Sequence, residues 1–440
     1  MSSTDGAVRY LEIRPNNVPA DGKISHKGGI PVINFTIGAQ NAILKPDSIR
    51  LSGRLHIWRN ALGTQVPDAA NSPDLMASEK LGVYGTMSQL VWRSAKTKQV
   101  CESVRHYGNF MASYLPVASS LQDSYGHRSE SALIMPSYSQ FQNNIIRNPE
   151  VGTEFCCPLL SGMTMGGENL NLMESGFGGL EGEVHLAPDS QFFYSNIGNV
   201  AAIGECFYQF QDLKILCEIY VPPPDELSRL MSEKKGVFNF NSITSYMSTI
   251  QSSNSIVNFH LGLSRVISAF VTFTPSAFIN NKAQNGYLTY LPTKNDDSVA
   301  DIDSVAFLKG GERFPYHFVV DTNVRTQPDC SVVDPQVVRY FANSIVPEEH
   351  QKRCSITPAN TNRGFTSAVG SYSQVPEGGS NYGVGVLYDM LNSDGVNFKT
   401  EAFTLQMNSG LTDGNPISAF LFVKHKTTLA WNEDGIEVVN

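Results

Sequence analysis

The sequence predicts an all-β protein made of two β-rich halves that join near the middle of the chain. Its 440 residues exceed the roughly 250 to 300 residues over which a single hydrophobic core grows, so two domains are expected. The 36 glycines, 24 phenylalanines, 23 prolines and 17 tyrosines are typical of many short strands joined by turns. Hydrophobic residues make up 41% of the chain and charged residues 17%, which indicates folded cores rather than disorder.

Strand patterns recur through the first half. In SIRLSGRLHIW (48–58), apolar residues and glycine alternate with polar residues, as they do in a half-buried strand. LKILCEIYV (213–221) alternates in the same way. The shorter runs PVINFTI, EFCCPLLSGM and GGLEGEVHLA are also strand-like.

The second half contains similar runs, separated by clusters of Gly, Asn, Asp and Pro. They are SRVISAFVTF, YHFVVD, YGVGVLYDM, EAFTLQM and ISAFLFVKHKTTLAW. This shared rhythm suggests a duplicated architecture, although the residues themselves do not repeat.

The middle of the chain predicts a connector between domains. Three prolines, 222–224, cannot donate hydrogen bonds to a sheet and should end the last strand of the first half. Asp225 is expected to cap a short helix with Leu227, Leu230 and Met231 on one side, and Gly236 to form its exit. The predicted domains are 1–222 with an N-terminal arm, the helical connector 223–236, and 237–440 with a C-terminal strand. The alternative is an ordinary loop between strands of one domain.

Four long polar segments interrupt the strands and are expected to carry surface function. They are residues 60–80, 118–152, 281–303 and 322–371.

The net charge limits the class of partner, and the cysteines indicate the redox state of the compartment. A net charge of −9 lacks the basic surplus that releases phosphate counterions, so no direct, sequence-specific contact with nucleic acid is expected. Seven cysteines without a C-x-x-C pair favour reduced thiols. The N-terminal residues resemble no signal peptide, and synthesis in the cytoplasm of a cell is expected.

Motifs for catalysis and metal binding are weak. GFGGLEG (176–182) runs toward a strand, whereas a phosphate-binding loop should open a helix, and the histidines lack metal-site spacing. EEHQKRC (348–354) is interpreted as a solvated turn, and the sequon at Asn34 falls in a predicted strand. No catalytic, cofactor-binding or metal-binding residue is predicted, and no cofactor.

One pair of carboxylates supports an alternative hypothesis about the function. Glu181 and Glu183 should share one face of a strand, and some β-sandwich glycosidases place paired carboxylates on a sheet. A carbohydrate-binding or carbohydrate-active tandem sandwich is therefore the alternative hypothesis, although exposed strand faces carry such pairs for solubility more often.

Several stretches, in the same order along the chain, resemble the double-jelly-roll major capsid proteins of the adenovirus-like lineage, especially those of polintons, polinton-like viruses and adintoviruses. LGVYGTMSQLVWRSAKTKQVCESVRHYGNFMASYL (81–115) looks like a family segment that leads through a turn into a tyrosine-containing helix. The matching positions there are Thr97, Gln99, Val100, Glu102 and Tyr107. FCCPLLSGM resembles a family strand, with matches at Phe155, Pro158, Leu159, Ser161 and Gly162.

Weaker similarity covers LMESGFGGLEGEVHLAPD, residues 236–273 and the closing strands, so the resemblance spans about residues 30 to 430. The resemblance is weak through residues 60–80 and 322–371.

The resemblance implies a fold of two tandem eight-stranded jelly-roll sandwiches with short helices and long loops, and no enzymatic activity. It implies a major capsid protein of a double-stranded DNA virus or virus-like element, located in the virion. Such proteins form pseudo-hexameric homotrimers that tile an icosahedral shell. The implied partners are other copies of the chain, minor capsid and penton proteins, and an internal membrane in some members.

Overall fold

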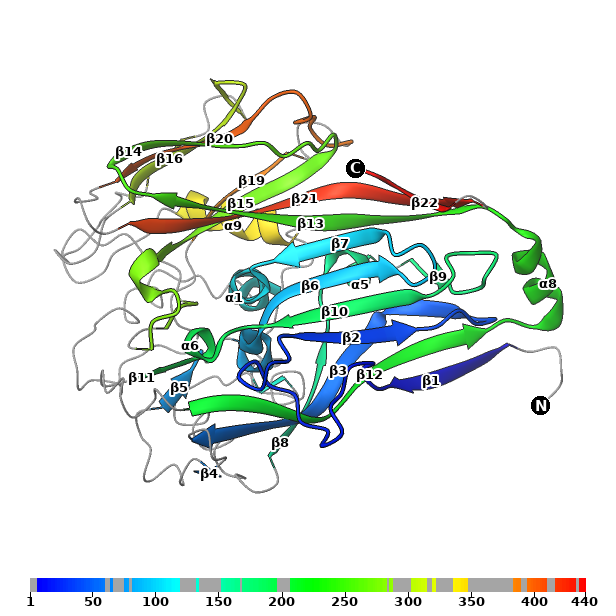
Figure 1. The fold of residues 1–440 in the computed structure, drawn as a ribbon. Coiled ribbons are helices and arrows are strands. Elements are labelled where there is room, and N and C mark those ends of the chain that lie inside the picture. The colour runs from blue at the N-terminus through cyan, green and yellow to red at the C-terminus, as the bar shows by residue number, and fades with distance from the viewer. Residues whose placement is uncertain are drawn as a thin grey trace.

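The computed structural model shows a two-lobed protein built mainly from antiparallel strands (Figure 1). It describes residues 6–59, 64–65, 75–78, 81–118, 132–133, 152–166, 168–195, 206–282, 285–287, 302–314, 319–321, 335–346, 383–388, 394–409, 416–432 and 435–440. The first lobe consists of the strands up to residue 221, and the second lobe of the strands from residue 236 onward.

The first lobe is a sandwich of two main sheets. Its strands are β1 (Ala7–Ile13), β2 (Val32–Ile37), β3 (Ile43–Arg59), β4 (Thr64–Gln65), β5 (Leu75–Ala77), β6 (Met87–Ser94), β7 (Val100–Arg105), β8 (Thr153–Pro158), β9 (Leu170–Asn171), β10 (Leu180–Leu186), β11 (Phe193–Ser195) and β12 (Cys206–Val221). One sheet has the order β1-β12-β3-β4, with β8 and β9 also paired to β3, and the other has the order β2-β10-β6-β7. A short ladder joins β11 to β5.

The second lobe repeats this plan. Its strands are β13 (Gly236–Ile250), β14 (Asn254–Phe259), β15 (Val266–Pro275), β16 (Ile302–Lys309), β17 (Glu312–Arg313), β18 (Val319–Asp321), β19 (Gly383–Leu387), β20 (Phe403–Ser409), β21 (Ile417–Asn432) and β22 (Gly435–Val439). One sheet has the order β13-β21-β15-β19, with β22 paired to β21. The other has the order β14-β20-β16-β17, with β18 paired to β16.

Eight strands of each lobe are arranged in the same order. Along the chain they are β1, β2, β3, β6, β7, β8, β10 and β12 in the first lobe, and β13 to β16 and β18 to β21 in the second. In both lobes the first, eighth, third and sixth of these strands form one sheet, and the second, seventh, fourth and fifth form the other. This is the topology of a jelly roll, so the predicted fold class of two tandem eight-stranded jelly rolls is confirmed.

Short helices occupy the connections between strands. They are η1 (Gly82–Thr86), α1 (Tyr107–Ala118), α5 (Gly162–Met165), α6 (Asp189–Phe192), α8 (Pro224–Ser232), η2 (Ser276–Phe278) and α9 (Pro335–Ile345). Helix α1 follows the fifth of the eight strands in the first lobe, and α9 follows the fifth in the second.

The connector contains the predicted helix, α8, but two details of the prediction are wrong. Pro223 is the N-cap residue, and no side chain caps the helix because proline has no side-chain hydrogen-bond acceptor; Asp225 lies in the first turn. Gly236 is the first residue of β13, where a Cβ atom would come within 2.3 Å of the Trp431 ring. None of the helix residues is buried, so Leu227 and its apolar neighbours do not pack into a core.

Strand pairing and hydrophobic burial divide the chain differently. Every ladder between described strands joins strands of the same lobe. The larger buried cluster, however, contains Leu51 of the first lobe together with Phe270 and Trp431 of the second. A separate cluster, with Val271 and Phe307, fills the space between the two sheets of the second lobe. The expectation of a self-contained interior on each side of the prolines is therefore wrong for the first lobe. The domain boundaries 1–222, 223–236 and 237–440 stay a prediction.

The four long polar segments fall mostly outside the described residues. Within them the structure describes β4, β5 and, in 322–371, the helix α9, where the sequence predicts only a polar loop. Ala132 and Leu133 in 118–152 and Tyr287 in 281–303 are buried, so the expected surface role is wrong for them. For the residues of 60–80, 118–152, 281–303 and 322–371 outside the described ranges, the surface role stays a prediction.

Candidate functional site: the junction between the two lobes

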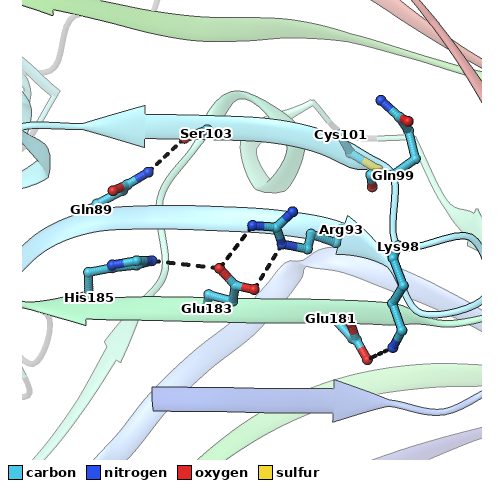
Figure 2. A network of polar contacts seen from close by, with 9 residues as sticks. All are labelled: Gln89, Arg93, Lys98, Gln99, Cys101, Ser103, Glu181, Glu183 and His185. Atoms are coloured by element: carbon cyan, nitrogen blue, oxygen red, sulfur yellow. Dashed lines mark hydrogen bonds and ion pairs between the residues drawn. The ribbon is translucent and has the colours of Figure 1, made fainter. Parts of the chain in front are cut away.

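The carboxylate pair that kept the carbohydrate hypothesis open lies on one face of β10, as predicted (Figure 2). Arg93 of β6 forms an ion pair with Glu183, with 2.8 Å between Nε and Oε1. Lys98 forms an ion pair with Glu181, and His185 Nε2 lies 3.6 Å from Glu183 Oε2. Basic side chains therefore compensate both carboxylates, which favours a structural role on the outer face of the sheet over a catalytic one.

The other weak motifs have simple positions in the fold. Gly178 and Gly179, with positive φ angles, lead directly into β10, which fits a turn before a strand. Asn34 lies within β2, as predicted. The segment EEHQKRC (348–354) lies outside the described residues. In the part of the chain that the structure describes, no cluster of three or more His, Cys, Asp or Glu could hold a metal ion.

The described thiols are suited to packing rather than to reactivity. Cys156 and Cys157 lie next to each other on β8, where Cys157 is buried and Cys156 is half-buried, because successive residues of a strand face opposite sides. Burial raises the pKa of Cys101 to about 12 and that of Cys217 to about 12, so both thiols stay protonated at neutral pH.

Glu102 of β7 is one of the residues that the family resemblance marked. The structure brings residues from both lobes together around it. Its side chain is only 2% exposed. Oε1 accepts hydrogen bonds from the backbone N–H of Gly162 at 3.0 Å and of Ile243 at 2.9 Å, and Oε2 accepts one from Met163 N–H at 2.8 Å. Ser242 Oγ donates a fourth bond at 3.2 Å. One carboxylate of the first lobe therefore holds α5 of its own lobe and β13 of the second lobe together.

Two opposed effects act on the Glu102 carboxyl. Burial raises its pKa above the ordinary value because the charged form loses its hydration. The hydrogen bonds from Met163, Ile243 and Gly162 lower the pKa, because they stabilise the charged form. A buried carboxylate needs such donors, and removing it would leave several backbone N–H groups without an acceptor.

The second matched motif, PLLSG (158–162), builds the other side of this contact. Ser161 is the N-cap of α5 and exchanges hydrogen bonds with Thr164 in a capping box. Its hydroxyl also accepts a hydrogen bond from the Trp92 indole N–H at 3.0 Å. A Cβ atom on Gly162 would lie 2.0 Å from the backbone oxygen of Asn241 in β13. Only glycine allows the two lobes to approach this closely.

Helix α1 packs an aromatic side chain into the junction between the lobes. The Phe110 ring centroid lies 5.7 Å from that of Phe422 and 6.4 Å from that of Phe270, both in the second lobe. Phe341 of α9 contacts Phe270 at 5.9 Å. Aromatic pairs at these separations add stabilisation to a large buried apolar area. Tyr287, also in the second half, donates a hydrogen bond from its hydroxyl to Gly85 O at 2.7 Å.

Two edge strands, β7 and β13, lie side by side along the junction (Figure 1). Besides the bond from Ile243 N–H to Glu102, Ser245 Oγ donates to Arg105 O at 2.7 Å. Each strand therefore covers part of the other's edge, which would otherwise expose backbone groups to unwanted pairing. The junction is a buried, hydrogen-bonded interface that fixes the two lobes relative to each other.

A buried histidine makes the second lobe sensitive to acid. His425 of β21 lies between Thr244 Oγ1, 2.9 Å from Nε2, and Thr427 Oγ1, 3.1 Å from Nδ1. Burial lowers its pKa to about 4. The unfolded chain therefore binds more protons than the folded one between pH 4 and about 6.5, so stability is full above about pH 6.5 and is lost as the pH falls toward 4.

We expect the free energy of unfolding to fall by up to about 3 kcal/mol across that window through His425 alone. The measurement is the denaturation midpoint at several pH values for the wild type and for His425→Gln, which cannot take up the proton. The variant should lose less stability on acidification than the wild type. Equal pH dependence of the two proteins would contradict this assignment.

Sequence reasoning found these residues only in part. The resemblance marked Glu102, Ser161 and Gly162, but not what they contact. Ile243, Phe270 and Phe422 were missed, because in the sequence they are ordinary apolar positions of strands. A glutamate two residues before the apolar Val104, and so expected on the same face of the strand, was the available signal. Among the described helices, none is long and apolar enough to span a membrane.

Comparison with known proteins finds similarity in structure only. No protein-family model matches the sequence. No curated protein matches it either. The Sputnik virophage structure superposes with a TM-score of 0.54 at 10% identity, over 99% of this chain and 89% of the other. The PBCV-1 virus capsid gives 0.51 at 10% identity, over 99% and 97%. The mavirus major capsid protein gives 0.50 at 10% identity, over 98% and 89%. The chain therefore has the double-jelly-roll fold of these viral capsid proteins.

Proposed function

We propose that this chain is the major capsid protein of a double-stranded DNA virus or virus-like element. The observation that carries the proposal is the extent of the structural match, which covers nearly all of this chain and about nine-tenths or more of each capsid protein chain. The match thus extends over both sandwiches. A closer relationship to polinton, polinton-like virus or adintovirus proteins stays a prediction.

The mechanism we propose is assembly of three copies into a pseudo-hexameric capsomer. Each chain provides two lobes of the same strand order, so three chains around a threefold axis place six similar lobes in a ring. A shell needs lobes with a fixed relative orientation, and the buried contacts of Glu102 and Phe110 fix that orientation within the chain. Contacts between capsomers would be weaker than contacts within them, so that assembly errors can reverse.

The remaining partners follow from this role. Neighbouring capsomers, minor capsid proteins and penton proteins would contact the outer flanks of the trimer, with an internal membrane beneath the shell in some viruses of this kind. The protein would be made in the host cytoplasm and end in the virion. With a net charge of −9, it would leave sequence-specific contacts with the genome to other proteins.

The test is the mass of the purified chain in solution. Three chains of 48.2 kDa predict a species of about 145 kDa by light scattering. Persistence of this mass on dilution to low micromolar concentration would support an obligate trimer. A stable 48.2 kDa monomer over the same range would contradict the proposal.

A further inference from the structure

Strand β1 is an exposed edge of the first lobe. It pairs with β12 along its whole length, and it is the end strand of its sheet (Figure 1). Val8 is 64% exposed and Tyr10 is 77% exposed. Leu11 and Ile13, on the opposite face, are partly buried and hold the strand to the core. A long edge strand with exposed apolar side chains is a pairing and aggregation hazard unless something covers it.

The second lobe contains the counterpart of this strand. β13 is the first of the eight strands of its lobe and pairs with the eighth, β21, as β1 pairs with β12. Both strands lie at the end of their sheets. Position in the fold therefore makes β1 and β13 equivalent.

The two equivalent edges differ in what covers them. The first lobe covers β13: Ile243 N–H donates to Glu102, and Ser245 Oγ donates to Arg105 O. The described residues provide no corresponding cover for β1, whose residues 7–10 are all exposed. Within the chain, the edge strand β13 is therefore covered, whereas the equivalent edge strand β1 is exposed.

We propose that the open edge of β1, with Val8 and Tyr10, binds the second lobe of another copy of this chain. The junction seen within the chain would then be repeated between chains. In the next copy, the strand that takes the place of β7 is β18, the fifth strand of its lobe. This inference rests on the proposed function, because only a closed ring of two-lobed chains requires alternating contacts within and between chains.

The chemistry of β1 suits a contact that forms after folding. The junction within the chain is buried and rich in aromatic residues. On β1 the apolar residues Val8 and Tyr10 alternate with Arg9, and Glu12 forms an ion pair with Lys214 at 3.0 Å. Tyrosine and arginine are enriched in protein interfaces, and a polar rim keeps the unassembled surface soluble.

The experiment uses the full chain with Tyr10→Lys and Val8→Lys as separate variants. Tyr10→Phe is the conservative control, and Ile256→Lys places the same charge at a 68% exposed apolar residue of β14. Each protein is measured by light scattering across a dilution series, with circular dichroism to report the fold. We expect both β1 variants to keep the wild-type circular dichroism spectrum and to dissociate at concentrations at least tenfold higher than the wild type. The two controls should assemble like the wild type.

The outcomes separate this inference from the proposed function. If the wild type does not self-associate, the proposed function fails. If the wild type assembles and both β1 variants assemble equally well, the assignment of β1 is overturned and the proposed function stands. Equal loss of assembly in Ile256→Lys would also overturn it, because the effect would not be specific to β1. Hydrogen exchange provides a check without substitutions: the amides of Val8 and Tyr10 should exchange more slowly in the assembled wild type than in the dissociated chain.

Discussion

Replacing Glu102 by alanine is expected to lower the free energy of unfolding by about 3 kcal/mol or more. The carboxylate accepts hydrogen bonds from three backbone N–H groups, those of Gly162, Met163 and Ile243. Each buried donor left without an acceptor costs about 1 to 3 kcal/mol. The measurement is the midpoint of chemical or thermal denaturation.

The same substitution should also uncouple the unfolding of one lobe from that of the other. Because Glu102 joins α5 to β13, its loss is expected to split a single unfolding transition into two. Glu154→Ala is the matched control, since the Glu154 side chain is 76% exposed and pairs with Arg54 at the surface. This control should cost about 1 kcal/mol or less. Equal effects of the two substitutions would show that Glu102 does not hold the lobes together.

Gly162→Ala is expected to push the lobes apart and to cost at least about 3 kcal/mol. The added Cβ would lie 2.0 Å from Asn241 O and 2.7 Å from Ser242 Cα, and backbone atoms cannot move aside as a flexible side chain can. The displacement would also lengthen the bonds from Gly162 and Ile243 to Glu102. Denaturation midpoints measure the cost, and protease sensitivity of the 223–236 connector reports the separation.

Gly38→Ala provides the control for this prediction. A Cβ atom there would have nothing within 4 Å. The control should change stability by less than about 1 kcal/mol, as alanine in place of an uncrowded glycine usually does. A Gly162→Ala protein as stable as this control would mean that the close approach of α5 and β13 is not needed.

The strands of the sandwiches were predictable because a local pattern determines them. Ile49, Leu51, Leu55 and Ile57 of β3 are buried, as their alternation predicts. His56, predicted to face solvent, is also buried, against Gly152 and in a stack with Trp58. Alternation describes one strand, and it cannot report what a distant segment places over the other face.

The contacts that form the junction could not be predicted from the sequence, for a related reason. Glu102 meets Ile243 across 141 positions of sequence, and Phe110 meets Phe422 across more than 300. No periodicity connects such residues. The connector illustrates a smaller failure: Asp225 is a favourable cap in general, but the preceding prolines start the helix and move the aspartate into its first turn.

Single-particle electron microscopy of the purified protein tests the central claim most directly, namely that a rigid pair of jelly rolls assembles in threes. The account predicts particles with threefold symmetry and six lobes of density in a pseudo-hexagonal ring, with a constant angle between the two lobes of each chain. Isolated two-lobed particles, or a variable angle between lobes, would contradict it.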